Sequence, residues 1–304
     1  MSARIPSARA RLLGLCVVLL PTGGLSPLKS EPFPIGKSER EVLVGETIWR
    51  VHAFKPDCYR EGPLIIVFHG SDRNPSLARN NAVAIAHAGC AVVVAPLFEY
   101  PQFRWAYHFG GLGELVEVEG RKQFRIKPDH LRTGYTVLQM IEALRGLEGR
   151  PGMSYSLIGH SAGAQFLGRF AAFYPNEARR IVLANAGSYL VPSWDHKYPY
   201  GFGGLTFIGE ADRRRYLRSP ITILLASEDI RREGLDKSDG AERQGSTRYE
   251  RGHATFQIAR AAAASEGLIF RWSLAEAQGL GHGSAKLYAR SEAIVALFGP
   301  QNMR

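Results

Sequence analysis

The fold is decided by residues 153–172, which read MSYSLIGHSAGAQFLGRFAA. Inside this stretch lies the pentapeptide Gly159-His160-Ser161-Ala162-Gly163. An apolar segment of strand type (155–158) leads directly into the pentapeptide, and a helix-like segment (162–173) follows it directly. This arrangement is typical of a turn that presents a serine hydroxyl above a sheet, and the flanking glycines remove Cβ atoms that would clash there. We therefore interpret Ser161 as a nucleophile.

A serine hydroxyl is a weak nucleophile at neutral pH, so it needs a base and a group that orients the base. Residues 220–226 form an apolar run that predicts a buried parallel strand ending at Glu228 and Asp229. Catalytic groups of open α/β sheets lie at this carboxyl edge. We expect Asp229 to orient the base, with Glu228 and Asp236 as alternatives. The competing interpretation of Asp229 is a helix N-cap or turn residue.

The expected base is His282, which lies between glycines in the loop that follows a predicted strand at 268–274. The competing interpretation of His282 is a solvated loop histidine. Because His160 lies inside the turn itself, we expect its side chain to point away from the partner of Ser161. Three further histidines are weaker candidates for the base: His69, His108 and His253.

A predicted strand at 63–68 is followed by His69-Gly70-Ser71-Asp72-Arg73-Asn74. A strand that ends in such a loop is typical of one half of an oxyanion hole. We expect one backbone N–H donor from Ser71, with Asp72 as the alternative, and a second donor from Ala162. For His69 a structural role, in which its imidazole braces the loop, is favoured over a catalytic role.

Together these segments resemble an α/β-hydrolase over residues 40–300. Within that superfamily the chain is similar to secreted esterases related to polyhydroxybutyrate depolymerases and feruloyl esterases. The loop 69–74, the segment 95–98 and the aromatic segment 103–109 support this resemblance. It implies a serine hydrolase that cleaves small-molecule or oligomeric carboxylic esters through an acyl-enzyme. Some such depolymerases carry a separate substrate-binding domain, for which this chain has no room.

The order of predicted elements indicates one α/β domain, residues 27–304, with a mostly parallel doubly wound sheet. An opening antiparallel pair is predicted at 42–44 and 47–53. Helices are predicted at 132–145, 162–173 and 253–264. Parallel strands are predicted at 64–68, 91–95, 155–158, 180–184, 220–226 and 268–274.

The segment 187–218 is too long for a simple connection and is rich in aromatic residues. Because it follows a predicted strand end, we expect it to form a cap that walls the substrate pocket. The alternative is ordinary loop packing. The residues expected to line the pocket are His69, Asn74, Tyr107, Trp194 and Tyr198.

The first 26 residues carry arginines ahead of a short apolar run (12–20), as in a secretory signal peptide. Nine apolar residues are too few to span a bilayer, so stable membrane insertion is not expected. The alternatives are an uncleaved anchor and a misassigned start. Secretion or a periplasmic location is the preferred interpretation. The sequence leaves open whether Cys58 and Cys90, which lie next to neighbouring predicted strands, form a bridge.

The formal net charge is +10, with 38 Lys and Arg against 28 Asp and Glu. The basic runs are scattered and no nucleic-acid motif accompanies them, so a nucleic-acid partner is not expected. No metal-ligand spacing and no Gly-rich dinucleotide motif occur in the sequence, so we predict no metal and no cofactor. Two other functions remain open: a peptidase or polyamide hydrolase, for which a basic surface would suit an acidic polymer, and a catalytically silent binding protein. The acyl and alcohol specificity and the oligomeric state also remain open.

Overall fold

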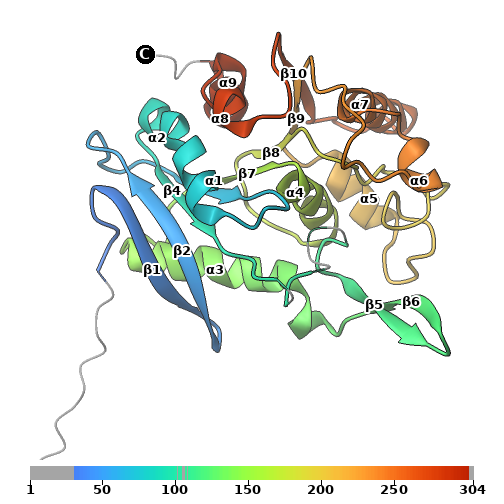
Figure 1. Cartoon of the computed structure of the whole chain (residues 1–304), viewed down its shortest axis with the longest axis horizontal. Coiled ribbons are helices and arrows are strands. Elements are labelled where there is room, and N and C mark those ends of the chain that lie inside the picture. Colours follow the sequence, from blue (N-terminus) through green and yellow to red (C-terminus); the bar gives the residue numbers. More distant parts are fainter. Residues whose placement is uncertain (1–30, 101, 105–106, 108, 301–304) are drawn as a thin grey trace, which may run out of the picture. The chain divides into compact units, whose positions relative to one another are not determined.

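The computed structural model describes residues 31–100, 102–104, 107 and 109–300. These residues form an eight-stranded sheet and a separate two-stranded sheet (Figure 1). The strands of the large sheet are β1 (Gly36–Val44), β2 (Thr47–Lys55), β3 (Leu64–Phe68), β4 (Val92–Pro96), β7 (Tyr155–His160), β8 (Ile181–Ala184), β9 (Ile221–Ala226) and β10 (Ser273–Ala277). The small sheet consists of β5 (Gly113–Val118) and β6 (Arg121–Ile126).

The large sheet has the strand order β1-β2-β4-β3-β7-β8-β9-β10. The hairpin of β1 and β2 is antiparallel to β4, and the strands from β4 to β10 across the sheet are parallel. The chain runs from β3 outward to β4 and then returns to place β7 on the other side of β3. Parallel sheets bind ligands at such a reversal, outside the carboxyl ends of the strands. The topology therefore directs attention to the loops that follow β3 and β7.

Both faces of the central part of the sheet are buried. In β3, Leu64, Ile66 and Phe68 belong to one apolar cluster, whereas Ile65 and Val67 belong to the other. This alternation follows from the opposite directions of successive strand side chains. Strands covered on both faces become continuous apolar runs, and β3, β4 and β9 are buried at every position.

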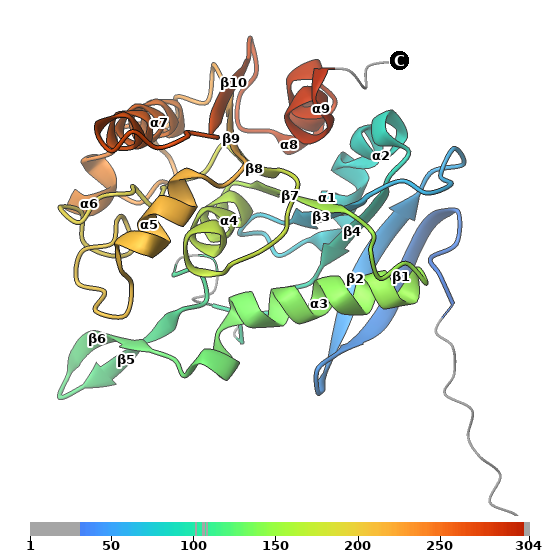
Figure 2. The same ribbon diagram turned by 180° about the vertical axis from the view of Figure 1, so that it is seen from behind.

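Helices cover the two faces in separate groups. The first cluster is covered by α3 (Thr133–Leu147), α4 (Ala162–Phe173), α5 (Glu210–Leu217) and α7 (Arg248–Ser265). In Figure 2, α3 crosses in front of β1 and β2. The second cluster is covered by α1 (Pro75–Asn81), α2 (Val83–Gly89), α8 (Ser284–Tyr288) and α9 (Ser291–Phe298). The short elements η1 (Asp129–Leu131) and α6 (Asp239–Glu242) lie in connecting segments. The predicted doubly wound α/β class is therefore confirmed.

One predicted strand was misplaced. The apolar run 268–274 predicted the last strand, but β10 begins at Ser273 and pairs with β9 from Ser273–Thr222 to Ala277–Ala226. The aromatic side chains before β10 pack on the neighbouring helices instead. The Trp272 ring stacks on the Phe270 ring, and Trp272 Nε1 donates a hydrogen bond to the carbonyl oxygen of Tyr216, 3.0 Å away. Their apolar character reflects contact with helices rather than pairing in the sheet.

The structure contains a bridge between Cys58 and Cys90, whose Cα atoms lie 5.4 Å apart. Cys58 precedes β3 and Cys90 precedes β4, and these strands are parallel neighbours. The two cysteines therefore meet at the end of the sheet opposite the carboxyl edge. This resolves the question that the sequence left open.

The predicted signal peptide, residues 1–26, lies outside the described residues. Within the described part of the chain, no helix combines the length and apolar character needed to cross a membrane.

Candidate active site

Ser161 occupies a strained turn between β7 and α4. Its backbone has φ +55° and ψ −116°, a left-handed conformation that side-chain-bearing residues rarely adopt. Its amide donates to the carbonyl oxygen of Ala184 at the end of β8, 2.9 Å away. Strain of this kind persists only where the surroundings hold it, and it concentrates at functional sites. The serine stands at the N-terminus of α4, where backbone N–H groups are free of helical partners.

The two glycines of the pentapeptide permit close backbone contacts. A Cβ atom on Gly159 would lie 2.4 Å from the carbonyl carbon of Gly163. A Cβ atom on Gly163 would lie 2.3 Å from the carbonyl oxygen of Phe68, at the end of β3. No side chain fits at such distances. The absence of Cβ atoms therefore lets α4 begin directly against the loop that follows β3.

His282 and Asp229 are hydrogen-bonded to each other. His282 Nδ1 lies 2.7 Å from Asp229 Oδ2. The Asp229 side chain is 1% exposed and that of His282 is 37% exposed. Arg248, on α7, places Nη1 3.5 Å from the other oxygen of Asp229. A buried carboxylate needs such partners, because an isolated buried charge is costly. Sequence reasoning missed Arg248, which follows the capping residue Thr247 and gave no other signal.

The sequence led us to expect that the His160 side chain points away from His282, the candidate base. This expectation was wrong. The ring of His160 lies against the ring of His282, with the centroids 4.6 Å apart. Because His160 is the last residue of β7, its side chain points to the face covered by α8, next to the loop of His282. Burial, together with the nearby His282, lowers the pKa of His160 from 6.5 to about 3. His160 is therefore a neutral ring at physiological pH.

The loop that follows β3 is braced by His69. The His69 imidazole accepts a hydrogen bond from the backbone N–H of Phe98 at 3.1 Å, and Nδ1 lies 2.9 Å from the carbonyl oxygen of Gly70. The hydroxyl of Tyr107 lies 3.0 Å from the same Nδ1. Burial lowers the pKa of His69 to about 4. These contacts fit a neutral structural histidine that fixes the loop carrying Ser71.

Arg73 adds a second brace. Its guanidinium donates to the carbonyl oxygens of Phe98 and Phe103, at 2.9 and 3.1 Å, and lies over the ring of Tyr107. The loop then ends at Asn74, whose side chain accepts from the amide of Leu77 and so caps α1. The loop 69–74 is held at both ends by side chains.

Ser161 and His282 line one cavity of about 450 Å³. In the described structure these two side chains do not share a hydrogen bond. Ser71, His69 and Asn74 also line this cavity. Gly70 lies close to Ser161, because a Cβ atom on it would stand 4.0 Å from Ser161 Cβ. The cavity thus joins the loops that follow β3, β7 and β10.

The other predicted pocket residues lie elsewhere. Tyr107 is buried behind His69. Trp194 donates from Nε1 to Glu210, 2.7 Å away, and packs on Phe202. The Tyr198 ring packs among Phe109, Phe124 and Phe173. None of the three predicted residues is among the described residues that line the cavity of Ser161.

The alternative candidates are engaged in other contacts. The carboxylate of Asp236 accepts from the Tyr200 hydroxyl and from the amide of Ser238. Nε2 of His253 lies 3.3 Å from Glu276. His108 falls outside the described residues. Glu228 lies beside Asp229 and lines an adjacent cavity. Within the described ranges, no cluster of three or more His, Cys, Asp or Glu side chains is arranged to hold a metal ion.

No protein-family model and no curated protein matches the chain. Solved structures do match it. The structure of poly(aspartic acid) hydrolase-1 from Sphingomonas sp. KT-1 is 26% identical with a TM-score of 0.77, and the alignment covers 86% of this chain and 99% of that chain. A poly(3-hydroxybutyrate) depolymerase from Bordetella parapertussis is also 26% identical, with a TM-score of 0.75 and coverage of 86% and 90%.

An S-formylglutathione hydrolase from Agrobacterium tumefaciens is 16% identical with a TM-score of 0.52, over 90% of this chain and 99% of that one. This third likeness bears on the fold alone. The two closer likenesses are both to hydrolases, which supports a hydrolytic enzyme.

Proposed function

We propose that this chain, which has the α/β-hydrolase fold, is a serine hydrolase that cleaves carboxylic esters through an acyl-enzyme. One observation carries the proposal. The strained Ser161 and His282 border a single cavity, and Asp229 holds His282 by a 2.7 Å hydrogen bond from behind it, although the three residues follow three different strands. A nucleophile, a base and a group that orients the base are the parts that acyl transfer requires.

In the proposed reaction, Ser161 Oγ attacks the carbonyl carbon of the ester while His282 Nε2 accepts its proton. His282 then protonates the leaving alcohol. A water molecule attacks the acyl-enzyme in the second half, again with His282 as the base. The 2.7 Å bond from Nδ1 to Asp229 supports this role because it leaves Nε2 free to accept a proton. Arg248 gives the buried carboxylate a cationic partner, 3.5 Å from its other oxygen.

The oxyanion of the tetrahedral intermediate would accept hydrogen bonds from the backbone N–H groups of Ala162 and Ser71. The close approach of Gly70 and Gly163 supports this arrangement, since it brings the loop after β3 against the first turn of α4. Each backbone donor of this kind contributes about 10²- to 10³-fold in turnover. The braces from His69 and Arg73 would hold one of these donors in place.

We also place the substrate pocket between this cavity and the segment 187–218. That segment starts beside the active site, because a Cβ atom on Gly187 would lie 2.4 Å from the side chain of Gln165 in the first turn of α4. Since Trp194 and Tyr198 do not line the cavity of Ser161 itself, their rings would contact only the part of a long substrate that extends beyond this cavity. The Cys58–Cys90 bridge supports secretion or a periplasmic location, because disulfides persist in oxidising compartments.

The test is Ser161→Ala, assayed on p-nitrophenyl esters of increasing chain length. We expect turnover to fall by about 10⁴- to 10⁶-fold with folding unchanged. Ser265→Ala, an exposed serine near the end of α7, is the matched control and should keep full activity. A fluorophosphonate probe should label the parent protein and the control but not Ser161→Ala. Near-native hydrolysis by Ser161→Ala would overturn the proposal.

A second candidate is an amide hydrolase of acidic polymers with the same catalytic residues. The likeness to a poly(aspartic acid) hydrolase and the net charge of +10 favour it. Parallel assays on poly(aspartic acid), on oligomers of 3-hydroxybutyrate and on simple esters separate the two. Release of short acidic fragments at a kcat/KM above that for the esters would select the amide hydrolase.

A further inference from the structure

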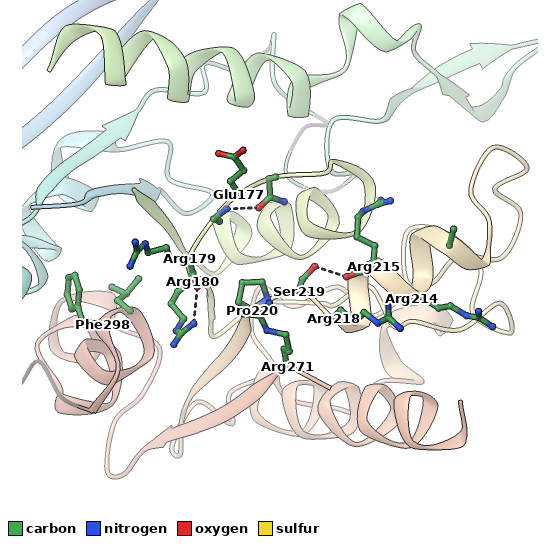
Figure 3. Close-up of a pocket in the computed structure, with 14 residues that line it drawn as sticks. Glu177, Arg179, Arg180, Arg214, Arg215, Arg218, Ser219, Pro220, Arg271 and Phe298 are labelled. Carbon is green, nitrogen blue, oxygen red and sulfur yellow. Dashed lines mark hydrogen bonds between the residues drawn. The ribbon is translucent and has the colours of Figure 1, made fainter. Parts of the chain in front are cut away.

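A second cavity, of about 900 Å³, is lined by arginines. Six of its lining residues are Arg179, Arg180, Arg214, Arg215, Arg218 and Arg271 (Figure 3). They come from three separate segments: the approach to β8, the helix α5 with the turn after it, and the approach to β10. Arg180 immediately precedes β8, and Pro220, which also lines the cavity, immediately precedes β9. The cavity therefore lies at the amino ends of the strands, opposite Ser161.

The positive charge of this cavity is only partly neutralised. Arg215 pairs with Asp212 at 2.6 Å, and Arg214 pairs with Glu266 at 2.9 Å. Among the described residues, no carboxylate lies within ion-pair distance of the four other arginines of the cavity: Arg179, Arg180, Arg218 and Arg271.

One acidic residue, Glu177, is found among the described lining residues. Its carboxylate lies 3.8 Å from Arg145, and its side chain is 82% exposed. Figure 3 shows Glu177 pointing away from Arg180 and Arg271. It therefore leaves the charge of these arginines uncompensated.

We infer that this cavity binds a chain of carboxylates, such as a segment of an acidic polypeptide or polymer, at a site separate from the catalytic one. Guanidinium groups match carboxylates through paired N–H donors. Several arginines around one hollow suit a ligand with several successive anionic groups. Nucleic acid is a poorer match, because single strands are bound by aromatic stacking platforms, and Phe298 is the one aromatic residue among the described lining residues.

The arginine-lined cavity lies far from Ser161, so a polymer bound there would not block the cavity of Ser161. β9 has six residues, so its two ends are roughly 20 Å apart. A polymer held at the amino ends of the strands would leave the cavity of Ser161 open. The site would anchor the protein to an acidic chain without occupying the reaction centre. This inference does not require the proposed ester hydrolysis to be correct, because it concerns binding alone.

The experiment measures binding of fluorescently labelled poly(L-glutamate) to the full-length protein at low ionic strength. The length of the polymer is measured again afterwards, to show that it was not cleaved during the experiment. The test variant is Arg218→Gln with Arg271→Gln. The matched control is Arg121→Gln with Lys122→Gln, which removes the same charge from exposed positions of β6. We expect the test variant to lose at least about tenfold in affinity, since it removes two charge-assisted contacts. The control should lose less than about twofold.

A second readout locates the bound polymer. Saturating poly(L-glutamate) should leave the hydrolysis of p-nitrophenyl acetate by the parent protein unchanged. Equal losses of affinity in test and control variants would show that net charge alone attracts the polymer, and would overturn the inference. Inhibition of ester hydrolysis that persists in the test variant would place the polymer at the catalytic cavity instead. Tighter binding of single-stranded DNA of equal charge would also contradict the inference.

Discussion

The imidazole of His160 lies against that of His282, with the ring centroids 4.6 Å apart. Since burial lowers the pKa of His160 to about 3, the two rings do not compete for a proton near neutrality. His160 therefore acts as a flat, uncharged support for the ring that we propose as the catalytic base.

Removing this support should slow the reaction. We expect His160→Ala to lower kcat by roughly 10- to 100-fold, because small errors in the position of a base are costly. KM for a short ester should change little. The acid limb of the profile of kcat/KM against pH should stay in place, because His160 does not titrate there. A shifted limb would mean that the two histidines share a proton.

The orienting carboxylate can be identified by ranking three variants. Asp229→Asn should lower kcat by about 10³- to 10⁴-fold, because an amide favours the wrong tautomer of His282. Glu228→Gln and Asp236→Asn should keep most of the activity. Asp236 accepts hydrogen bonds from Tyr200 and Ser238. Steady-state kinetics on one ester decide the ranking, and the reverse order would show that the acid was misassigned.

Glycine is required at position 163 but not at 168. In Gly163→Ala the new methyl group meets the carbonyl oxygen of Phe68 at 2.3 Å. The free energy of unfolding should therefore fall by about 1 to 3 kcal/mol. In Gly168→Ala, on the same helix, the nearest atom is 3.5 Å away and alanine is the better helix former. The control should therefore be neutral or more stable. Urea denaturation of both variants provides the measurement.

His69 should make stability depend on pH. Its pKa is about 4 in the folded chain and near 6.5 when unfolded, so between these values only the unfolded chain binds the proton. The free energy of unfolding should therefore decrease as the pH falls from 6.5 towards 4, by up to about 1.4 kcal/mol per pH unit for this group. In His69→Gln the slope of the free energy of unfolding against pH, measured between pH 4 and 6.5, should be smaller by that amount. An identical slope in the variant would mean that His69 is not buried in its neutral form.

The segment 187–218 should influence substrate choice. If it walls the pocket, Trp194→Ala should cost roughly 1 to 3 kcal/mol in kcat/KM for a long ester and almost nothing for an acetyl ester. The measurement is the ratio of kcat/KM for the long ester to kcat/KM for the acetyl ester, in the variant and in the parent protein. Loss of the Trp194–Glu210 hydrogen bond alone would lower both constants together through poorer folding. An unchanged ratio would show that the segment packs away from the substrate.

The central sheet and α4 could be predicted because they depend on local patterns. Apolar runs of strand length and a serine between two glycines specify β7 and its turn without reference to distant residues. Helix α4 begins and ends where it was predicted, at Ala162 and Phe173. The antiparallel pair at the start was also predicted, although β1 and β2 extend to Gly36 and Lys55.

The remaining features depend on tertiary contacts. The hairpin of β5 and β6 was not predicted, because its exposed, charged strands lack a buried face that would give a period of two. Arg248 meets Asp229 only through the docking of α7, and no local signal marks an arginine that pairs across the fold. The position of His160 depends likewise on the loop of His282, more than a hundred residues away.

The Cys58–Cys90 bond closes a stretch of chain that contains β3, the braced loop, α1 and α2, with a sequence separation of 32 residues. Closing a loop of this length restricts the unfolded chain by about 3 to 4 kcal/mol. Yet the bond sits at the amino end of β3, while the loop of Ser71 leaves the other end. The disulfide and the loop that we propose for the oxyanion hole therefore lie at opposite ends of one strand. We therefore expect that a protein folded without this bond unfolds faster at high temperature, whereas the folded molecules keep the same turnover number.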